Sequence, residues 1–503
     1  MKIYKYLFLL IGLTFFACSD LEEEPVGLLA PDGFFKTTQD IQTASNAAYG
    51  HMTHEDFWGR KMSLTLMMRG DMVTFGDPTT SQRRIDHDQF TVQADNGMID
   101  GYWLRVYQII AAANQAIAGA DDVDVAAEVK NPVTAQAYFA RAFAYFHLVR
   151  QFGDIPYISE PVSDLEAASS ISKTSASEVY ANILSDLEFA KTWLPNTQAA
   201  RSIPAKSAAH SYLALVHLTM GNYQSAYDEA KGVIDNEGAY NLGLEPDFQD
   251  LFDATKIDAS MEPIFTLDFI GASNGDDGRD YQAALTGLRD DEQYGLGGGW
   301  SVAVPSLEVY NTWDGRDYRK SVSLDTTGVF NGVVQPYQVF KESGAGRGVN
   351  RPHIAKYTRN TGNTATGNGR GSEQNYSMMR YAEVLLIAAE ALNELSGGSA
   401  EAAGYINRVR ERARNGSSFP ADISGASQGD FRDIVLEERK WELAFEYKRW
   451  YDIARRRLGG EVFGPSGLEG NKENFDPNRD YLLPILADEL SRNPNLEPQN
   501  PGY

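Results

Sequence analysis

Apolar residues recur at helical spacing through most of the first half of the chain. Residues 137–149 are rich in Ala, Phe, Tyr and Leu, and they follow Asn131 and Pro132, a pair typical of a helix start. We expect this helix to stop at Gly153. In residues 177–194, Val, Ile, Leu and Ala recur at spacings of three and four. These patterns predict a mainly α fold.

Two segments have the pattern of short helix pairs. Residues 208–234 match a tetratricopeptide repeat, with Gly221 at the turn between its two helices. Small residues that let the two helices approach each other stand at Ala214, Ala226 and Ala230. A second pair is predicted at residues 381–395 and 399–414, with Ser399 as the cap of its second helix. Several such pairs predict a short helical array that serves as a scaffold.

The middle of the chain, residues 263–377, has a different pattern. Phe265, Leu267 and Phe269 alternate with polar residues, which is the spacing of a strand. Stretches rich in Gly, Asp and Asn follow at residues 271–280, 295–299 and 362–371. Because loops on a rigid scaffold often carry binding residues, this segment is predicted to be an irregular, loop-rich ligand-binding region with a few short strands.

The first 17 residues have the pattern of a secretory signal peptide. Lys2 and Lys5 precede an apolar run that is too short to span a bilayer, and Ala17 precedes Cys18, the only cysteine of the chain. The thiol of Cys18 and the amine that cleavage exposes can both carry acyl chains, which predicts a lipid anchor. This leader resembles a bacterial lipoprotein signal. The acidic tether that follows, within residues 18–25, resembles the surface-export tag of Bacteroidetes lipoproteins.

The formal net charge of −24 at pH 7 narrows the choice of partners. Such an acidic chain repels phosphate backbones and anionic membrane surfaces, so no nucleic-acid partner is expected. Neutral and cationic ligands stay open.

The candidate catalytic and metal-binding patterns lack the context that they need. Residues 271–275 fit G-x-S-x-G, but Asp276, Asp277 and Gly278 prevent the helix that must follow a nucleophile elbow. The seven histidines form no metal-binding motif. No metal site and no cofactor are therefore predicted. A glycosidase stays open, because its two carboxylates need to be close only in space.

One stripe of carboxylates lies on a predicted helix. Glu438, Glu442 and Glu446 are four residues apart and share one face. We interpret the stripe as structural. Its expected partners are the nearby cations Arg439, Lys440, Lys448 and Arg449.

The last third of the chain resembles the SusD/RagB family, the nutrient-binding lipoproteins of Bacteroidetes outer membranes. The resemblance begins at residues 380–386, RYAEVLL, followed by Glu390 and Ala391. It continues through the helix that carries the carboxylate stripe, although Tyr447 stands where the family usually has glycine. It ends in YLLPI at residues 481–485 and in NPNL and QNPGY near the C-terminus.

This resemblance implies a single domain over residues 26–503, with four tetratricopeptide-like helix pairs that support an irregular face. This domain is expected to have three parts: a helical N-terminal part (residues 26–262), an irregular loop-rich segment (263–377) and a helical C-terminal part (378–503). It also implies a non-enzymatic, lipid-anchored receptor outside the outer membrane. Such a receptor captures oligosaccharide and delivers it to a SusC-like TonB-dependent transporter. Two alternatives stay open: a surface glycoside hydrolase with a carboxylate pair, and a peptide-binding or helical-repeat scaffold of the same transporter class.

Carbohydrate binding needs aromatic faces for sugar C–H surfaces and polar groups for hydroxyls, held on oriented loops. Two regions have these residue types, in the positions where the family usually builds its site. The candidates are Asp71, Phe75 and Asp77 in one loop and Tyr281, Tyr294 and Trp300 beside the glycine-rich stretches. Arg83, Arg84 and Arg351 are additional polar candidates, whereas Trp103, Trp313, Trp441 and Trp450 are assigned to the core.

Overall fold

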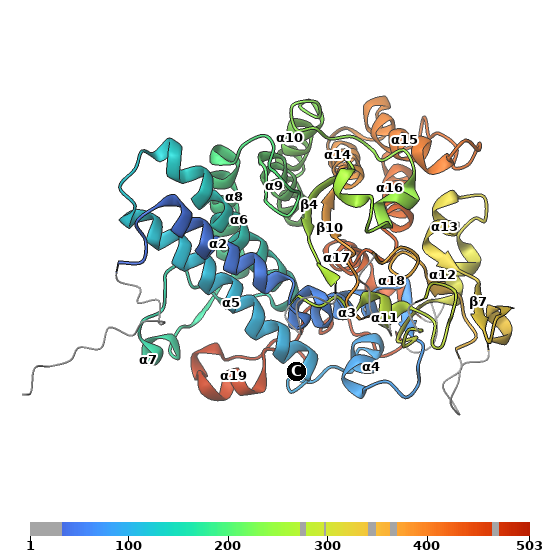
Figure 1. Cartoon of the computed structure of the whole chain (residues 1–503), viewed down its shortest axis with the longest axis horizontal. Helices are drawn as coiled ribbons and strands as arrows, with labels where there is room; N and C mark the ends of the chain where they lie inside the picture. The colour runs from blue at the N-terminus through green and yellow to red at the C-terminus, as the bar shows by residue number, and fades with distance from the viewer. Residues whose placement is uncertain (1–32, 272–277, 296–297, 341–348, 363–369, 465–471) are drawn as a thin grey trace, which may run out of the picture.

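Long helices stack side by side along the chain, as Figure 1 shows. The computed structural model describes residues 33–271, 278–295, 298–340, 349–362, 370–464 and 472–503, so Cys18 and its tether lie outside the described residues. Four consecutive helix pairs contact one another in sequence order. They are α2 (Thr38–Met52) with α5 (Gly97–Gly119), α6 (Ala127–Phe152) with α8 (Ala176–Trp193), α9 (Lys206–Met220) with α10 (Tyr223–Ile234), and α14 (Tyr381–Ser396) with α15 (Ala400–Arg414). The mainly α prediction is confirmed.

Local sequence explains where most of these helices begin and end. Gly221 ends α9 with a φ of +77°, a conformation that glycine adopts without strain. The Ser399 side chain accepts a hydrogen bond from the Ala402 N–H and caps α15, as predicted. The predicted start of α6 is wrong, because the helix begins at Ala127 and contains Pro132. Pro132 is the sixth residue of α6, so it removes the hydrogen bond from its own position to the carbonyl of Glu128, yet the first turn stays helical.

One hydrophobic core runs through the whole array, from Ala48 to Leu496. Helix α14 lies at its centre and is packed on several sides, by α10, α15 and α16 (Gln428–Glu442). Its residues from Tyr381 to Ala391 are all buried, and the two glutamates among them, Glu383 and Glu390, are ion-paired with Arg439 and Arg455. Among the described helices, none combines the length and hydrophobicity needed to cross a bilayer.

Within the described residues the strands form five two-stranded antiparallel pairs, and some of them join distant parts of the chain. The pairs are β1 (Val73–Phe75) with β5 (Ala303–Pro305), β4 (Pro263–Leu267) with β10 (Tyr376–Arg380), β2 (Ile155–Pro156) with β3 (Lys173–Thr174), β6 (Leu324–Asp325) with β9 (His353–Ile354), and β7 (Thr327–Phe330) with β8 (Val333–Pro336). The predicted strand at Phe265 is β4. All five of its residues are buried, so its polar Thr266 does not mark a solvent-facing side.

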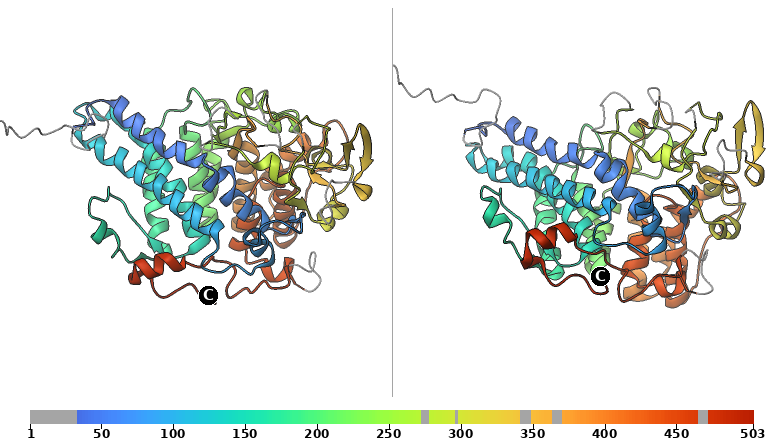
Figure 2. Two further views of the ribbon diagram at one scale, coloured as in Figure 1. Left: turned by 60° about the horizontal axis from the view of Figure 1, so that its bottom comes forward. Right: turned by 90° about the horizontal axis from the view of Figure 1, so that it is seen from below.

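Short helices and loops fill the rest of the fold. The short α-helices are α3 (Lys61–Met68), α4 (Gln82–Gln89), α7 (Leu165–Ala168), α11 (Gln282–Thr286), α12 (Leu307–Thr312), α13 (Tyr318–Ser323), α17 (Arg449–Arg455), α18 (Gly459–Val462) and α19 (Ala487–Arg492). In both views of Figure 2 the loop-rich segment between β4 and β10 lies on the side opposite the C-terminus. The helical array therefore presents this segment on one face of the molecule.

Buried ion pairs hold the loop-rich segment on the helices. Glu442 on α16 accepts hydrogen bonds from Arg319 at 3.0 Å, from Arg380 at 2.5 Å and from Arg412. Glu446 pairs with Arg380 and with Lys356. The structural interpretation of these carboxylates is thus correct, but the predicted single helical face is wrong for Glu446, because α16 ends at Glu442 and Glu446 lies in the turn that follows. The two partners of Glu446 and the three of Glu442 also come from distant segments rather than from the neighbouring cations.

Candidate functional site

Tyr281 and Trp300 meet on the loop-rich face. Their ring centroids are 5.9 Å apart and the ring planes are inclined by 49°. Backbone hydrogen bonds fix this pair: the Trp300 N–H donates to the Ala284 carbonyl at 2.6 Å, and the Tyr281 N–H donates to the Gly59 carbonyl at 3.0 Å. Tyr281 is buried, while Trp300 is half-buried against the core. We call this pair the aromatic platform.

The two regions that the sequence offered as candidates are neighbours in space. Strand β1 pairs with β5, and the Asp77 N–H donates to the Ser301 carbonyl at 2.8 Å, directly beside Trp300. Gly76 makes this approach feasible, because a Cβ at this position would lie 2.4 Å from the Ser301 oxygen. Phe75 is half-buried and packs against the core. The loop of residues 69–77 therefore borders the aromatic platform.

The two carboxylates of that loop are engaged in ion pairs. Both oxygens of Asp71 accept from the Arg449 guanidinium, at 2.8 and 2.7 Å. Burial raises the pKa of Asp71, but the charge of Arg449 outweighs burial and lowers that pKa below its usual value. Asp77 accepts from Arg289 at 2.5 Å and from the backbone and hydroxyl of Thr79. Asp71 therefore joins the loop to α17, and Asp77 orients Arg289.

Arginines surround the aromatic platform. The Arg60 guanidinium lies 4.9 Å from the centre of the Tyr281 ring, and that of Arg370 lies 5.6 Å from the Trp300 ring. Arg289 also donates to the Trp300 carbonyl at 2.9 Å. Sequence reasoning missed these three residues, because arginine is common and only Arg370 stands in a glycine-rich stretch. The predicted Arg84 belongs to the same neighbourhood: its guanidinium donates to the Thr80 hydroxyl at 3.2 Å, and the Thr80 N–H donates to the Asp77 carbonyl at 3.1 Å.

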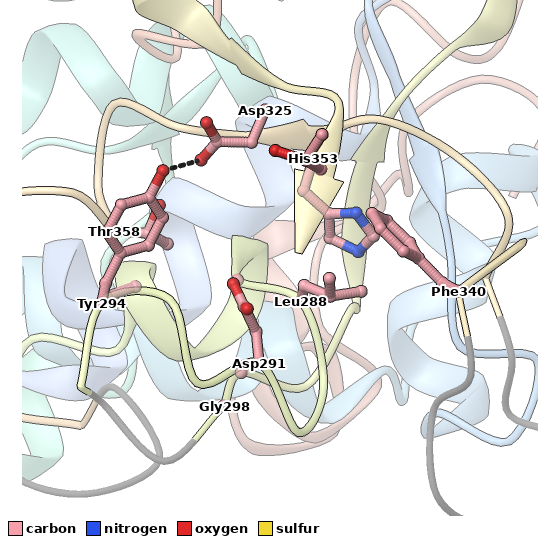
Figure 3. Close-up of a pocket in the computed structure, with 12 residues that line it drawn as sticks. Leu288, Asp291, Tyr294, Gly298, Asp325, Phe340, His353 and Thr358 are labelled. Atoms are coloured by element: carbon pink, nitrogen blue, oxygen red, sulfur yellow. Dashed lines mark hydrogen bonds between the residues drawn. The ribbon is translucent and has the colours of Figure 1, made fainter. Parts of the chain in front are cut away.

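Tyr294 lies in a separate pocket, drawn in Figure 3, whose lining includes Asp291, Asp325 and His353. The Tyr294 hydroxyl donates to Asp325 at 3.0 Å, and burial lowers the pKa of His353 to about 4. The free volume is about 20 Å³, enough for a water molecule but not for a sugar ring. Tyr294 therefore lines a small pocket beside the platform. His353 in this pocket contacts the Ser301 hydroxyl at 3.2 Å, next to Trp300, and also the carbonyl of the predicted Arg351.

A larger open cleft, of about 510 Å³, lies between α6, α8, α17 and the C-terminal segment. Arg150 and Tyr451 line it, with the guanidinium 3.5 Å from the ring centre. Its lining is rich in arginine and tyrosine, so it is not the apolar groove that a helix-binding scaffold needs. Across the described residues no group of three or more metal-ligating side chains was found, and Ser273 of the G-x-S-x-G pattern lies outside them.

Comparison with known proteins identifies the family. A profile described as the SusD family matches residues 330–503, and one described as "Starch-binding associating with outer membrane" matches residues 30–218. SusD-like protein P2 of Formosa agariphila is 56% identical over 508 residues, covering all of both chains. The chain belongs to the SusD family.

Solved structures of SusD-family proteins share the fold. A SusD homologue from Bacteroides thetaiotaomicron superposes with a TM-score of 0.82 at 19% identity, covering 94% of this chain and 98% of the other. A laminarin-binding SusD-like protein gives 0.78 at 24% identity, covering 93% and 100%. Surface glycan-binding protein A from Bacteroides thetaiotaomicron, in complex with laminarihexaose, gives 0.76 at 20% identity, covering 92% and 99%. The predicted SusD-like fold, with its tetratricopeptide-like array, is confirmed.

Proposed function

We propose that this SusD-family chain is a cell-surface lipoprotein that binds oligosaccharide and delivers it to a SusC-like TonB-dependent transporter. The observation that carries the proposal is the aromatic platform, since a half-buried Trp300 presents an aromatic face among polar groups. Sugar rings stack on such faces through their C–H surfaces, while hydrogen-bond donors around the platform bind hydroxyls. Two SusD-like proteins of the same fold are described as binding laminarin and as holding laminarihexaose, which supports a glycan as ligand.

Within this proposal the candidate residues have different tasks. Trp300 provides the stacking surface, the buried Tyr281 packs against it from behind, and Asp77 holds Arg289 against the Trp300 carbonyl. Phe75 pairs with Ala303 across the β1–β5 ladder and packs against the core. Asp71 and Tyr294 are not assigned contacts with the ligand. Asp71 is engaged in an ion pair with Arg449, and Tyr294 lines a pocket that is too small for a sugar ring.

Replacing Trp300 with alanine tests the proposal. We expect affinity for the bound oligosaccharide to fall at least tenfold, since stacking on an aromatic ring is lost, with no change in helix content by circular dichroism. Trp193→Ala is the matched control, because Trp193 is also half-buried against the core but lies at the end of α8. A Trp300→Ala protein that binds as well as the wild type would show that the ligand sits elsewhere.

The hydrolase alternative needs a carboxyl group with a raised pKa that reaches the ligand. Burial raises the pKa of Asp280 to about 6. Its side chain is fully buried, however, and accepts hydrogen bonds from the Tyr376 hydroxyl at 2.8 Å, from the Gln282 N–H and from Ser372. We therefore propose binding without catalysis. Chromatography of a glycan incubated with the purified protein checks this, and released product would favour the hydrolase.

The anchor and the transporter partnership need separate tests. Cys18→Ala should release the protein from the membrane fraction, because the acyl chains that anchor it stably are lost with the cysteine. Glycan affinity should stay unchanged. Retention of this variant on membranes washed with high salt would contradict the lipid anchor. Co-purification of the native lipoprotein with a TonB-dependent transporter from detergent-solubilised outer membranes tests the partner.

A further inference from the structure

The charge of the side chains around the aromatic platform differs in sign from that of the whole chain. Arg60, Arg84 and Arg289 lie around Tyr281 and Trp300, and Arg83 adjoins Arg84 on α4. On this basis we infer that the oligosaccharide bound here is acidic and carries carboxylate or sulfate groups. The inference rests on the proposed function, because it names the class of glycan for the same platform.

Arg83 and Arg84 have guanidinium groups that the protein does not neutralise. The Nε of each is buried without a hydrogen-bond partner, and neither forms an ion pair with a carboxylate in the described parts of the chain. In the described residues, the one side chain that accepts a hydrogen bond from Arg84 is Thr80, whose hydroxyl lies 3.2 Å from the guanidinium. By contrast, the buried Arg319 and Arg380 each face two or more carboxylates. The fold thus supplies counter-charges elsewhere but not to this pair.

Arg84 stands among like charges. Burial and the charges of Arg60 and Arg83 lower the pKa of Arg84 to about 10, and Asp77 only partly opposes them. Asp77 is also shared, because it forms a 2.5 Å ion pair with Arg289. Arg60 pairs with Glu55 at 2.7 Å and Arg289 with Asp77, so of these four guanidinium groups the described residues leave those of Arg83 and Arg84 without a counter-charge. These two like charges repel each other, and an anion bound beside them relieves the repulsion. Carboxylate and sulfate oxygens also fit the planar fork of arginine, which binds two oxygens at once.

The acidic ligand is compatible with the net charge of −24. At physiological ionic strength, charges more than about 8 Å apart are largely screened at exposed positions. A short oligosaccharide on the aromatic platform therefore senses the nearby arginines more than the rest of the surface. The overall charge disfavours a polyanion that contacts much of the protein surface, as a nucleic acid would, but not an acidic polysaccharide that contacts the protein only at the platform.

The experiment compares acidic polysaccharides with their own neutral derivatives in native affinity electrophoresis. Uronic-acid polymers are paired with their carboxyl-reduced forms, and sulfated polymers with their desulfated forms, so linkage is constant within each pair. We expect at least one acidic polymer to bind tenfold or more tightly than its derivative, since a hydrogen bond to a charged group contributes about that factor. The pair that shows this difference tells whether carboxylate or sulfate is recognised.

Substitutions connect the preference to the arginines. Arg84→Gln should remove most of the difference between the acidic polymer and its derivative, while Arg84→Lys should retain part of it because the charge remains. Arg316→Gln is the control, since Arg316 is exposed and pairs with Asp314 away from the platform. Added NaCl should weaken binding of the acidic polymer to the wild type, because local attraction is screened.

The outcomes separate this inference from the proposed function. Equal binding of acidic and neutral forms, unchanged in Arg84→Gln, would overturn the acidic class and leave the glycan receptor intact. Binding of the acidic polymer that strengthens with salt would also overturn it, since that result means net repulsion at the site. Failure of every polymer, acidic or neutral, to bind would count against glycan binding itself.

Discussion

Replacing Glu442 with glutamine removes one negative charge from a buried site that three arginines share. Glu442 is fully buried and accepts from Arg319, Arg380 and Arg412. Removal of one partner from a buried ion pair typically lowers the free energy of unfolding by 3–5 kcal/mol. Because the arginines keep other carboxylates, such as Glu262, we expect the lower end of this range, about 3 kcal/mol. A chain of this size has an unfolding entropy of about 1 kcal/mol/K, so Tm should fall by about 3 °C.

Calorimetry or thermal circular dichroism measures this change, and Glu437→Gln is the matched control. Glu437 lies on the same helix, but its side chain is exposed, so its Tm should hardly change. Burial raises the pKa of Glu442, but the three arginines outweigh burial and hold that pKa far below 4.5. The stability difference from wild type should therefore be full above pH 4.5 and shrink at lower pH, as the wild-type carboxylate is protonated. Equal Tm values for the two variants at pH 7 would refute the reasoning.

Three other substitutions test the core and the platform. Gly76→Ala should weaken oligosaccharide binding about tenfold by displacing the Trp300 segment, whereas Gly50→Ala, with open space around its Cβ, should leave binding unchanged in the same affinity assay. Burial raises the pKa of Asp280 from 3.8 to about 6, so wild-type stability should fall relative to Asp280→Asn by about 3 kcal/mol as the pH rises from about 3 to 7. Urea unfolding at several pH values measures this, and a constant difference would contradict it. Tyr447→Gly should lower the free energy of unfolding by about 2 kcal/mol. The ring contacts that are lost outweigh the strain that glycine relieves at a backbone φ of +65°. A variant that is more stable than the wild type in urea would contradict this.

Patterns that depend on neighbouring residues were predictable from the sequence. The pair α9 and α10, with Gly221 between them, and the pair α14 and α15, capped by Ser399, lie where the spacing of apolar and small residues placed them. Each of these features depends on residues within one or two helical turns. The start of α6 was missed because the packing of a 26-residue helix overrides a local cap and proline.

Contacts between distant segments were not predictable. The predicted carboxylate stripe correctly indicated ion pairs, but Arg380 is 62 residues from Glu442, and no periodicity connects them. The aromatic platform also depends on contacts between distant segments, since Arg60 and Tyr281 come together only in the folded chain. At Tyr447 the sequence showed only a departure from the family's usual glycine. The structure supplies the reason for that glycine, because the backbone there has a φ of +65°, which glycine adopts without strain.

Different groups determine where the platform lies and which ligand it selects. Backbone hydrogen bonds hold it, from Trp300 to Ala284 and from Asp77 to Ser301, and buried ion pairs fasten the surrounding loops to α16 and to the turn that follows it. The groups that would select a ligand are side chains on this frame, such as Arg84. Exchange of those side chains alters charge and hydrogen bonding at the surface without removing a backbone contact. A SusD-family fold can therefore change the class of glycan that it binds while the helical array beneath stays the same.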